Sequence, residues 1–226
     1  MASSGRQFGE GPLSRVSALL YTLIVVELLV LLASLPGLVP LALLDADASN
    51  IPVVALCALP FGPAVSAALY AIGRRSTDIT DIAPARAFWR GYRMNAGGVL
   101  KLWIPWLVWM TIIGVNLAGF SAARVPSWWA VVLVLIALAS SVWMANALVI
   151  TSLFAFRARD IARLAVYFLF RTPVVALGTA ALLALAIVVT AYVSVFAALA
   201  LATVLAMALL SVGRRMTDQV RDRFTA

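Results

Sequence analysis

The sequence predicts an all-α, polytopic membrane protein with six transmembrane helices and both termini in the cytoplasm. Three observations lead there: the composition, the lengths of the apolar runs and the placement of the arginines. Of 226 residues, 64% are hydrophobic and only 12% are charged, and the mean hydropathy is +1.05. Soluble domains are roughly half apolar and a quarter charged. A chain this short cannot hide so many apolar side chains, so a bilayer must cover the excess.

The apolar runs define the spans of a single membrane domain, residues 1–226. Their expected bounds are 16–35, 51–73, 98–120, 127–156, 173–192 and 194–213. The last two spans share one uncharged run, 173–213, which as a single helix would be ~60 Å long, about twice the hydrocarbon thickness. We therefore expect the chain to fold back near residues 192–194. Pro36 and Pro40 are expected to end the first helix.

Basic residues set the orientation. With the N-terminus inside, 16 of the 17 arginines and lysines lie on the cytoplasmic side, and only Arg124 lies outside. Cytoplasmic loops carry this excess in most membrane proteins. The net charge of +8 is thus explained by topology, because the basic residues lie between apolar runs instead of clustering on a soluble surface. The lipid bilayer is an expected partner and nucleic acid is not.

Residue types that carry chemistry are scarce. The chain has no histidine and a single cysteine, Cys57, so we expect neither a metal site nor a disulfide within the chain. Glu27 is the only acidic residue inside an apolar span. One carboxyl group cannot supply the acid, base and nucleophile of an active site. We therefore expect no enzyme activity and no cofactor.

Glu27 lies twelve residues beyond Arg15, so about 18 Å deep and near the bilayer midplane. An ionised carboxyl group facing lipid there would cost several kcal/mol, so Glu27 is expected to face the helix bundle. The prolines at positions 60 and 63 lie at a similar depth and should break the second span near residues 60–63. The helix after that break would begin with free N–H groups near residues 64–67.

One mid-membrane polar cluster is the candidate site of this chain. Asn146 on the fourth span is eleven residues from the cytoplasmic Arg157, which places it at the same depth as Glu27. The candidate residues are Glu27, Pro60, Gly62, Pro63 and Asn146. Two interpretations remain open. Broken helices at this depth are typical of substrate sites in transporters, whereas Glu27 could instead cap the broken helix and hold the bundle together.

The longest polar stretch contains an amphipathic pattern that predicts an interfacial helix over 81–96. Ile82, Phe88, Trp89 and their helical neighbours form one apolar stripe. Three arginines flank this stripe: Arg86, Arg90 and Arg93. Such a helix lies in the membrane interface with its arginines near lipid phosphates. It could be a simple anchor or a docking helix for a partner protein, and the sequence leaves both open.

Several motifs in the first half of the chain form a block. They are Leu59-Pro60-Phe61-Gly62-Pro63-Ala64, Ala67-Ala68-Leu69-Tyr70, Phe88-Trp89-Arg90, Tyr92-Arg93-Met94-Asn95, the opening Gly11-Pro12-Leu13-Ser14-Arg15 and Ser34-Leu35-Pro36. This block, which covers most of residues 9–102, resembles the YesL-like family of bacterial membrane proteins, whose function is unknown. The stretch between Pro36 and Pro60 is longer than in the family's usual pattern.

The resemblance implies a bacterial cell (inner) membrane protein that acts beside a carbohydrate transport system. It brings no catalytic or binding residues with it. The leading prediction is therefore a non-enzymatic accessory protein that partners the permease subunits of a sugar ABC transporter through its arginine-bearing helix. The alternative is a small secondary carrier or channel that uses the site around Glu27. A structural or regulatory scaffold is a third class, and neither the substrate nor the oligomeric state is indicated.

Overall fold

The computed structural model describes residues 12–45, 47–74, 83–122, 125–194, 197 and 200–224. All regular structure within these residues is helical. The elements are α1 (Pro12–Ala42), the short 3-10 helix η1 (Ala48–Asn50), α2 (Ile51–Cys57), α3 (Phe61–Gly73), α4 (Pro84–Ala118), α5 (Trp128–Leu153), α6 (Ala158–Arg171), α7 (Pro173–Tyr192), α9 (Ala202–Val212) and α10 (Arg214–Phe224).

Four helices are long and apolar enough to cross a membrane: α1, α4, α5 and α7. The pair formed by α2, with the η1 turn before it, and α3 makes a fifth candidate if it counts as one span bent by 44°. Helix α9 has 11 residues, well short of the roughly 20 that a bilayer requires. The structure thus supports a membrane-embedded protein with four or five apolar spans.

The two sides of α1 show why its environment must be apolar. Residues four apart on one side are buried, including Thr22, Val26 and Val30. Leu28 on the opposite side is 61% exposed, and the exposed positions beside it, including Ile24 at 59% and Leu32 at 52%, are also apolar. A surface helix of a soluble protein would carry polar residues there. An exposed apolar face of this length is instead covered by lipid or by another protein.

Helix α1 does not end at residue 35, as the prolines predicted, but continues through Pro36 and Pro40 to Ala42. Gly37 explains part of this correction. A Cβ atom built at Gly37 would overlap the carbonyl oxygen of Cys57, so the backbones of α1 and α2 touch directly there. Each proline removes only one backbone donor, and this close packing compensates for the loss.

The arginine-bearing segment also differs from the expectation of a separate helix over 81–96. Pro84 begins a single helix, α4, that continues through Gly97 and Gly98 to Ala118. A helical glycine costs only about 1 kcal/mol, and the neighbouring Val99 is fully buried in the core. Burial on both sides of the glycines therefore keeps one helix continuous. Residues 81 and 82 lie outside the described part of the chain.

Three other segments have the expected helical positions. Helix α5 lies where the fourth span was expected and α7 where the fifth was expected, and α7 ends at Tyr192, where a turn was predicted. The second span is broken, with α2 ending at Cys57 and α3 beginning at Phe61. The sixth expected span, 194–213, is represented by the shorter α9, and some of its residues lie outside the described part.

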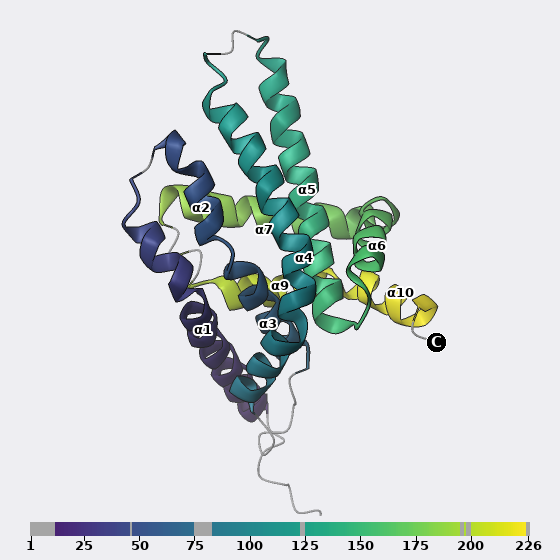
Figure 1. Ribbon diagram of the computed structural model, residues 1–226. Helices are drawn as coiled ribbons and strands as arrows, with labels where there is room; N and C mark the ends of the chain where they lie inside the picture. Colours follow the sequence, from purple (N-terminus) through teal and green to yellow (C-terminus); the bar gives the residue numbers. More distant parts are fainter. Residues whose placement is uncertain are drawn as a thin grey trace, which may run out of the picture.

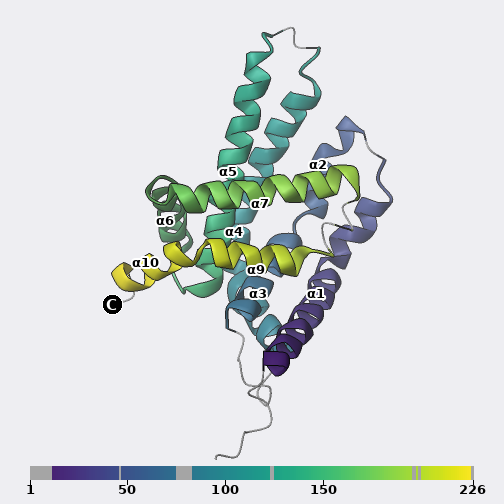
Figure 2. The same cartoon turned by 180° about the vertical axis from the view of Figure 1, so that it is seen from behind.

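Helix α3 lies at the centre of the molecule and packs against α1, α4, α5 and α9. Helices α4 and α5 form a long hairpin whose tip projects from the rest of the structure (Figure 1). Helices α7 and α9 lie side by side and cross this hairpin instead of running along it, as the view from behind also shows (Figure 2).

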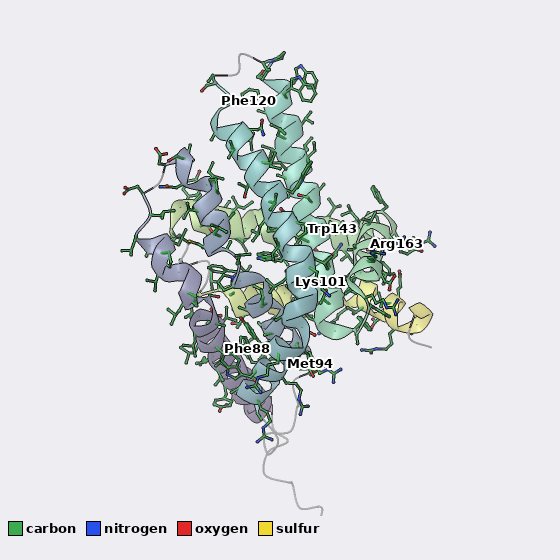
Figure 3. The ribbon with its side chains drawn as sticks, in the orientation of Figure 1. Phe88, Met94, Lys101, Phe120, Trp143 and Arg163 are labelled. Atoms are coloured by element: carbon green, nitrogen blue, oxygen red, sulfur yellow. The ribbon has the colours of Figure 1, made fainter. Side chains whose placement is uncertain are left out.

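Two further helices, α6 and α10, were not predicted from the sequence. Helix α6 buries Ile161 and Phe168, and α10 buries Met216 and Val220, all in the same core as Phe88 of α4. The arginine side chains that the structure describes in these two helices are exposed, and Arg163 lies at the periphery of the molecule (Figure 3). Apolar residues three or four apart, among charged ones, are the pattern of a helix with one buried face, and this signal was present in both segments.

Candidate functional site

Glu27 of α1 binds the beginning of α9. Its Oε2 atom accepts a hydrogen bond of 2.9 Å from the backbone N–H of Thr203 and one of 2.6 Å from the Thr203 hydroxyl. The first N–H groups of a helix have no partner within the helix, and that end carries partial positive charge. The α9 N-cap residue, Leu201, supplies no side-chain hydrogen bond. Glu27 therefore caps α9 from a different helix.

The same carboxyl group is only half satisfied. Its second oxygen, Oε1, is buried and has no hydrogen-bond partner. A buried acceptor without a donor costs roughly 1–3 kcal/mol. The Glu27 side chain thus ties α1 to α9 through one oxygen and leaves the other free to accept a hydrogen bond.

The location of this cap corrects one part of the sequence interpretation. Glu27 was expected to meet the helix that follows the break at 60–63, which is α3. Its hydrogen bonds go instead to Thr203 of α9, 176 residues away in sequence. Sequence analysis did not identify Thr203, because no local pattern tells which helix end a distant carboxylate will reach.

The break itself is held by α4. The Trp103 indole N–H donates a 3.0 Å hydrogen bond to the Ala58 carbonyl oxygen, which α2 leaves available at its end. A Cβ atom built at Gly62 would lie 2.6 Å from the Trp103 ring, so only glycine allows the ring to lie this close. Pro60 is the N-cap of α3, and Pro63 is buried one turn further on.

Free N–H groups near residues 64–67 were expected, and this expectation is wrong. The Ala64 N–H donates a 3.2 Å hydrogen bond to the Pro60 carbonyl oxygen. Helix α3 already begins at Phe61, because proline is tolerated in the first turn of a helix, where its missing N–H would have no partner. The start of α3 is also nearly without free donors, because the Phe61 N–H bonds the Ala58 carbonyl oxygen at 3.2 Å and Pro63 has no N–H.

Asn146 of α5 is 1% exposed, and its side-chain amide nitrogen has no hydrogen-bond partner. It donates no bond to Glu27 or to the backbone at the break. The five predicted residues therefore do not form one hydrogen-bonded cluster. They form a cap at α9, a glycine–tryptophan contact at the break and a buried amide on α5.

A cavity of about 350 Å³ nevertheless lies among the same helices. Its walls include Phe61 at the start of α3, Ala145 beside Asn146, and Ala202 beside Thr203. None of the five predicted residues lines it. Of the helices that carry predicted residues, α3 and α5 line this cavity and α1 does not.

Thr179 of α7 is the polar residue in the wall of this cavity, and sequence analysis missed it. Its side chain is fully buried and its hydroxyl oxygen has no partner. Threonines in helices usually bond the carbonyl oxygen four residues earlier, as Thr151 and Thr190 do here. Thr179 is an exception that nothing in the sequence distinguishes.

The arginine-bearing part of α4 has one buried and one exposed face. Arg86, Arg90 and Arg93 are all exposed, while Phe88 and Gly91 are buried. Figure 3 shows Phe88 at the opposite end of α4 from Phe120, at the tip of the hairpin. The exposed arginines are therefore carried on a helix that is fixed along its other face.

Within the described residues, no group of three or more histidine, cysteine, aspartate or glutamate side chains could hold a metal ion. Comparison with protein-family models, curated proteins and solved structures finds no match to this chain.

Proposed function

We propose that this chain is a non-enzymatic accessory protein of the bacterial cell membrane, and that it contacts the permease subunits of a carbohydrate ABC transporter. The contact surface in this proposal is the exposed face of α4 that carries Arg86, Arg90 and Arg93. The observation that carries the proposal is the continuity of α4. The same helix that presents the arginines extends into an apolar span, so the arginines have a fixed position relative to the membrane.

The composition of this face supports a protein partner. Between the arginines lie Trp89, which is 38% exposed, and Met94, which is 63% exposed. Arginine, tryptophan and methionine are enriched in protein–protein interfaces.

The membrane topology belongs to the same proposal. Six spans with both termini in the cytoplasm place 16 of the 17 basic residues inside, and the turn after Tyr192 supports a separation of the last two spans. Family membership is likewise part of the proposal and rests on the YesL-like motifs between residues 59 and 95. Cysteines introduced at Ser127 and Asp160 test the topology. Ser127→Cys should react with an impermeant reagent in intact cells, and Asp160→Cys only after permeabilisation.

Co-purification tests the partner. We expect the full chain to retain a sugar permease in mild detergent, and Arg86→Gln, Arg90→Gln and Arg93→Gln together to abolish this retention. The matched control replaces three exposed arginines at α6, Arg157, Arg159 and Arg163, by glutamine. Equal retention by both triple variants would refute the assignment of the α4 face.

Unsatisfied polar atoms favour a second candidate, a small carrier or channel. Glu27 Oε1, Asn146 Nδ2 and Thr179 Oγ1 are all buried without partners. Polar groups inside a membrane are expensive and often mark transport pathways. Transport by the protein alone in liposomes, lost in Glu27→Gln, would support this candidate. The accessory proposal instead expects Glu27→Gln to leave permease binding intact.

A further inference from the structure

The space beneath α7 is larger than the cavity at Thr179. A second cavity of about 840 Å³ lies between α7 and the α4–α5 hairpin. Ala145, Leu183 and Ala186 line both cavities, so the two adjoin along α7. Ligand pockets in proteins typically have volumes of about 300–1,000 Å³. Together the two cavities form an elongated slot, which we call the α7 slot.

The walls of the α7 slot are almost entirely apolar, with two polar atoms that have no partner. Thr179 Oγ1 lies at the end near the beginning of α7, and Trp106 Nε1 lies in the wall of the larger cavity. Both groups can donate a hydrogen bond. An apolar slot with one or two unpaired donors fits a ligand that is mostly hydrocarbon and carries a hydrogen-bond acceptor.

The shape of the slot narrows the class of ligand. The α7 residues that line it extend from Thr179 to Ala191. This is about 18 Å at 1.5 Å per residue. A linear acyl chain of a membrane lipid has this length, and a compact ring system does not.

The surroundings indicate where the ligand comes from. Residues of α7 that line neither cavity are apolar and exposed, with Leu177 at 72% and Leu185 at 52%. A ligand therefore reaches the slot through lipid. Arg171, which is exposed, comes directly before α7 begins. Its charge suits a lipid phosphate.

We propose that the α7 slot binds one acyl chain of a phospholipid, with its ester carbonyl oxygen accepting a hydrogen bond from the Thr179 hydroxyl. The acyl chain then lies beneath α7 and extends toward Trp106, and the lipid phosphate lies near Arg171. This inference rests on the membrane embedding in the proposed function, but not on the permease partner.

Phospholipid content of the purified full chain tests the site. We expect about one tightly held phospholipid per chain by native mass spectrometry, because the slot has room for one acyl chain along α7. Ala186→Phe fills the junction of the two cavities and should remove it. Ala181→Phe is the matched control on the same helix, because Ala181 is exposed and lines neither cavity. Equal lipid retention by both variants would overturn the proposal.

Substitutions at two threonines, Thr179 and Thr190, test the proposed hydrogen bond between the Thr179 hydroxyl and the lipid without disturbing the fold. Thr179→Val removes an unpaired hydroxyl, so the delipidated protein should be as stable as before or more stable. Its affinity for added phospholipid should fall about fivefold, the worth of one ordinary hydrogen bond. Thr190→Val is the control, since the Thr190 hydroxyl already bonds the Ala186 carbonyl oxygen at 2.8 Å. Unchanged affinity in Thr179→Val would refute the assigned contact.

Adding ligands to the delipidated protein tests whether the bound acyl chain belongs to a phospholipid or to a free fatty acid. Phospholipid should restore thermal stability, and a free fatty acid of the same length should restore less, because it lacks the phosphate that Arg171 would bind. If only the fatty acid restores stability, the phospholipid assignment is wrong. If the purified protein keeps its lipid but binds no permease, the accessory proposal is refuted and the lipid proposal is not.

Discussion

Helices α3 and α7 both lie in the apolar part of the molecule, but they pack in opposite ways. Ten of the 13 residues of α3 are buried, against two of the 20 residues of α7. Helix α3 is surrounded by four other helices and contacts them through small residues such as Ala64, Ala67 and Ala68. Small residues let helices in membranes approach closely.

Helix α7 instead crosses its neighbours and lies over two cavities. A Cβ atom built at Gly178, the glycine of α7, would meet the Val212 side chain at 2.7 Å and not backbone. The comparison shows that closely packed and loosely packed apolar helices cannot be told apart by hydrophobicity, because both are almost wholly apolar. We therefore expect substitutions around α3 to act on stability and substitutions around α7 to act on ligand content.

The largest effect is expected at the α1–α2 contact beside α3. Gly37→Ala places a methyl group onto the Cys57 carbonyl oxygen, and backbone cannot rotate away as a side chain can. We expect a loss of about 3 kcal/mol, at the upper end for overpacking, measured by unfolding in detergent. Gly178→Ala meets only the movable Val212 side chain and should cost clearly less. Equal losses would contradict the difference drawn between the two regions.

Gly97→Ala is the control for the substitutions Gly37→Ala and Gly178→Ala. Nothing lies within 4 Å of a Cβ atom built at Gly97. Alanine is favoured over glycine in a helix by about 1 kcal/mol, so this variant should be neutral or stabilising. A loss of stability here would mean that α4 is not continuous through Gly97 and Gly98.

The tryptophan at the break should give the next largest effect. Trp103→Phe keeps an aromatic ring against Gly62 but removes the hydrogen bond to the Ala58 carbonyl oxygen. We expect a loss of roughly 1–3 kcal/mol in the same unfolding assay, from the lost hydrogen bond and the smaller ring together. The Ala58 carbonyl oxygen keeps its 3.2 Å hydrogen bond from the Phe61 N–H. Trp109→Phe is a suitable control, because Trp109 is 46% exposed on the same helix. A smaller loss in Trp103→Phe than in the control would rule out the role assigned to this bond.

The cap of α9 should contribute less to overall stability, because it fixes only one short helix. Thr203→Val removes the hydroxyl donor and leaves the backbone N–H bound to Glu27. The expected loss is about 1 kcal/mol, typical of one hydrogen bond. Hydrogen exchange should be faster in α9 than in wild type, while exchange in α3 stays unchanged. Uniformly faster exchange would show that the cap supports the whole bundle.

The smallest effect is expected in the polar loop before α2. Interactions with the Ser49 side chain and then the Ser49 N–H keep the pKa of Asp47 below its usual value. A lowered folded-state pKa stabilises the fold above the usual aspartate value of about 3.9, and this contribution is lost as the pH falls below it. Asp47→Asn should therefore flatten the acid side of the stability curve slightly. An unchanged acid limb would contradict the cap seen at 2.7 Å between Asp47 Oδ1 and the Ser49 N–H.

The sequence determined the helical class, the apolar character of the molecule and most helix positions. Length and composition are sums over residues, so they predict α5 and α7 and the turn after Tyr192 without any tertiary information. Prolines predicted the break between α2 and α3 but not its exact register. They also gave a wrong end for α1, because a contact from another helix, at Gly37, outweighs the local preference.

Only the tertiary structure decided the partners of the polar side chains. The depth of Glu27 followed from counting residues, but its binding to Thr203 depends on how helices far apart in sequence meet. The same holds for Thr179, whose hydroxyl differs from that of Thr190 only in what surrounds it. Hydrogen bonds and cavities depend on distances of a few ångströms between separate helices, and a sequence pattern along one helix does not contain them.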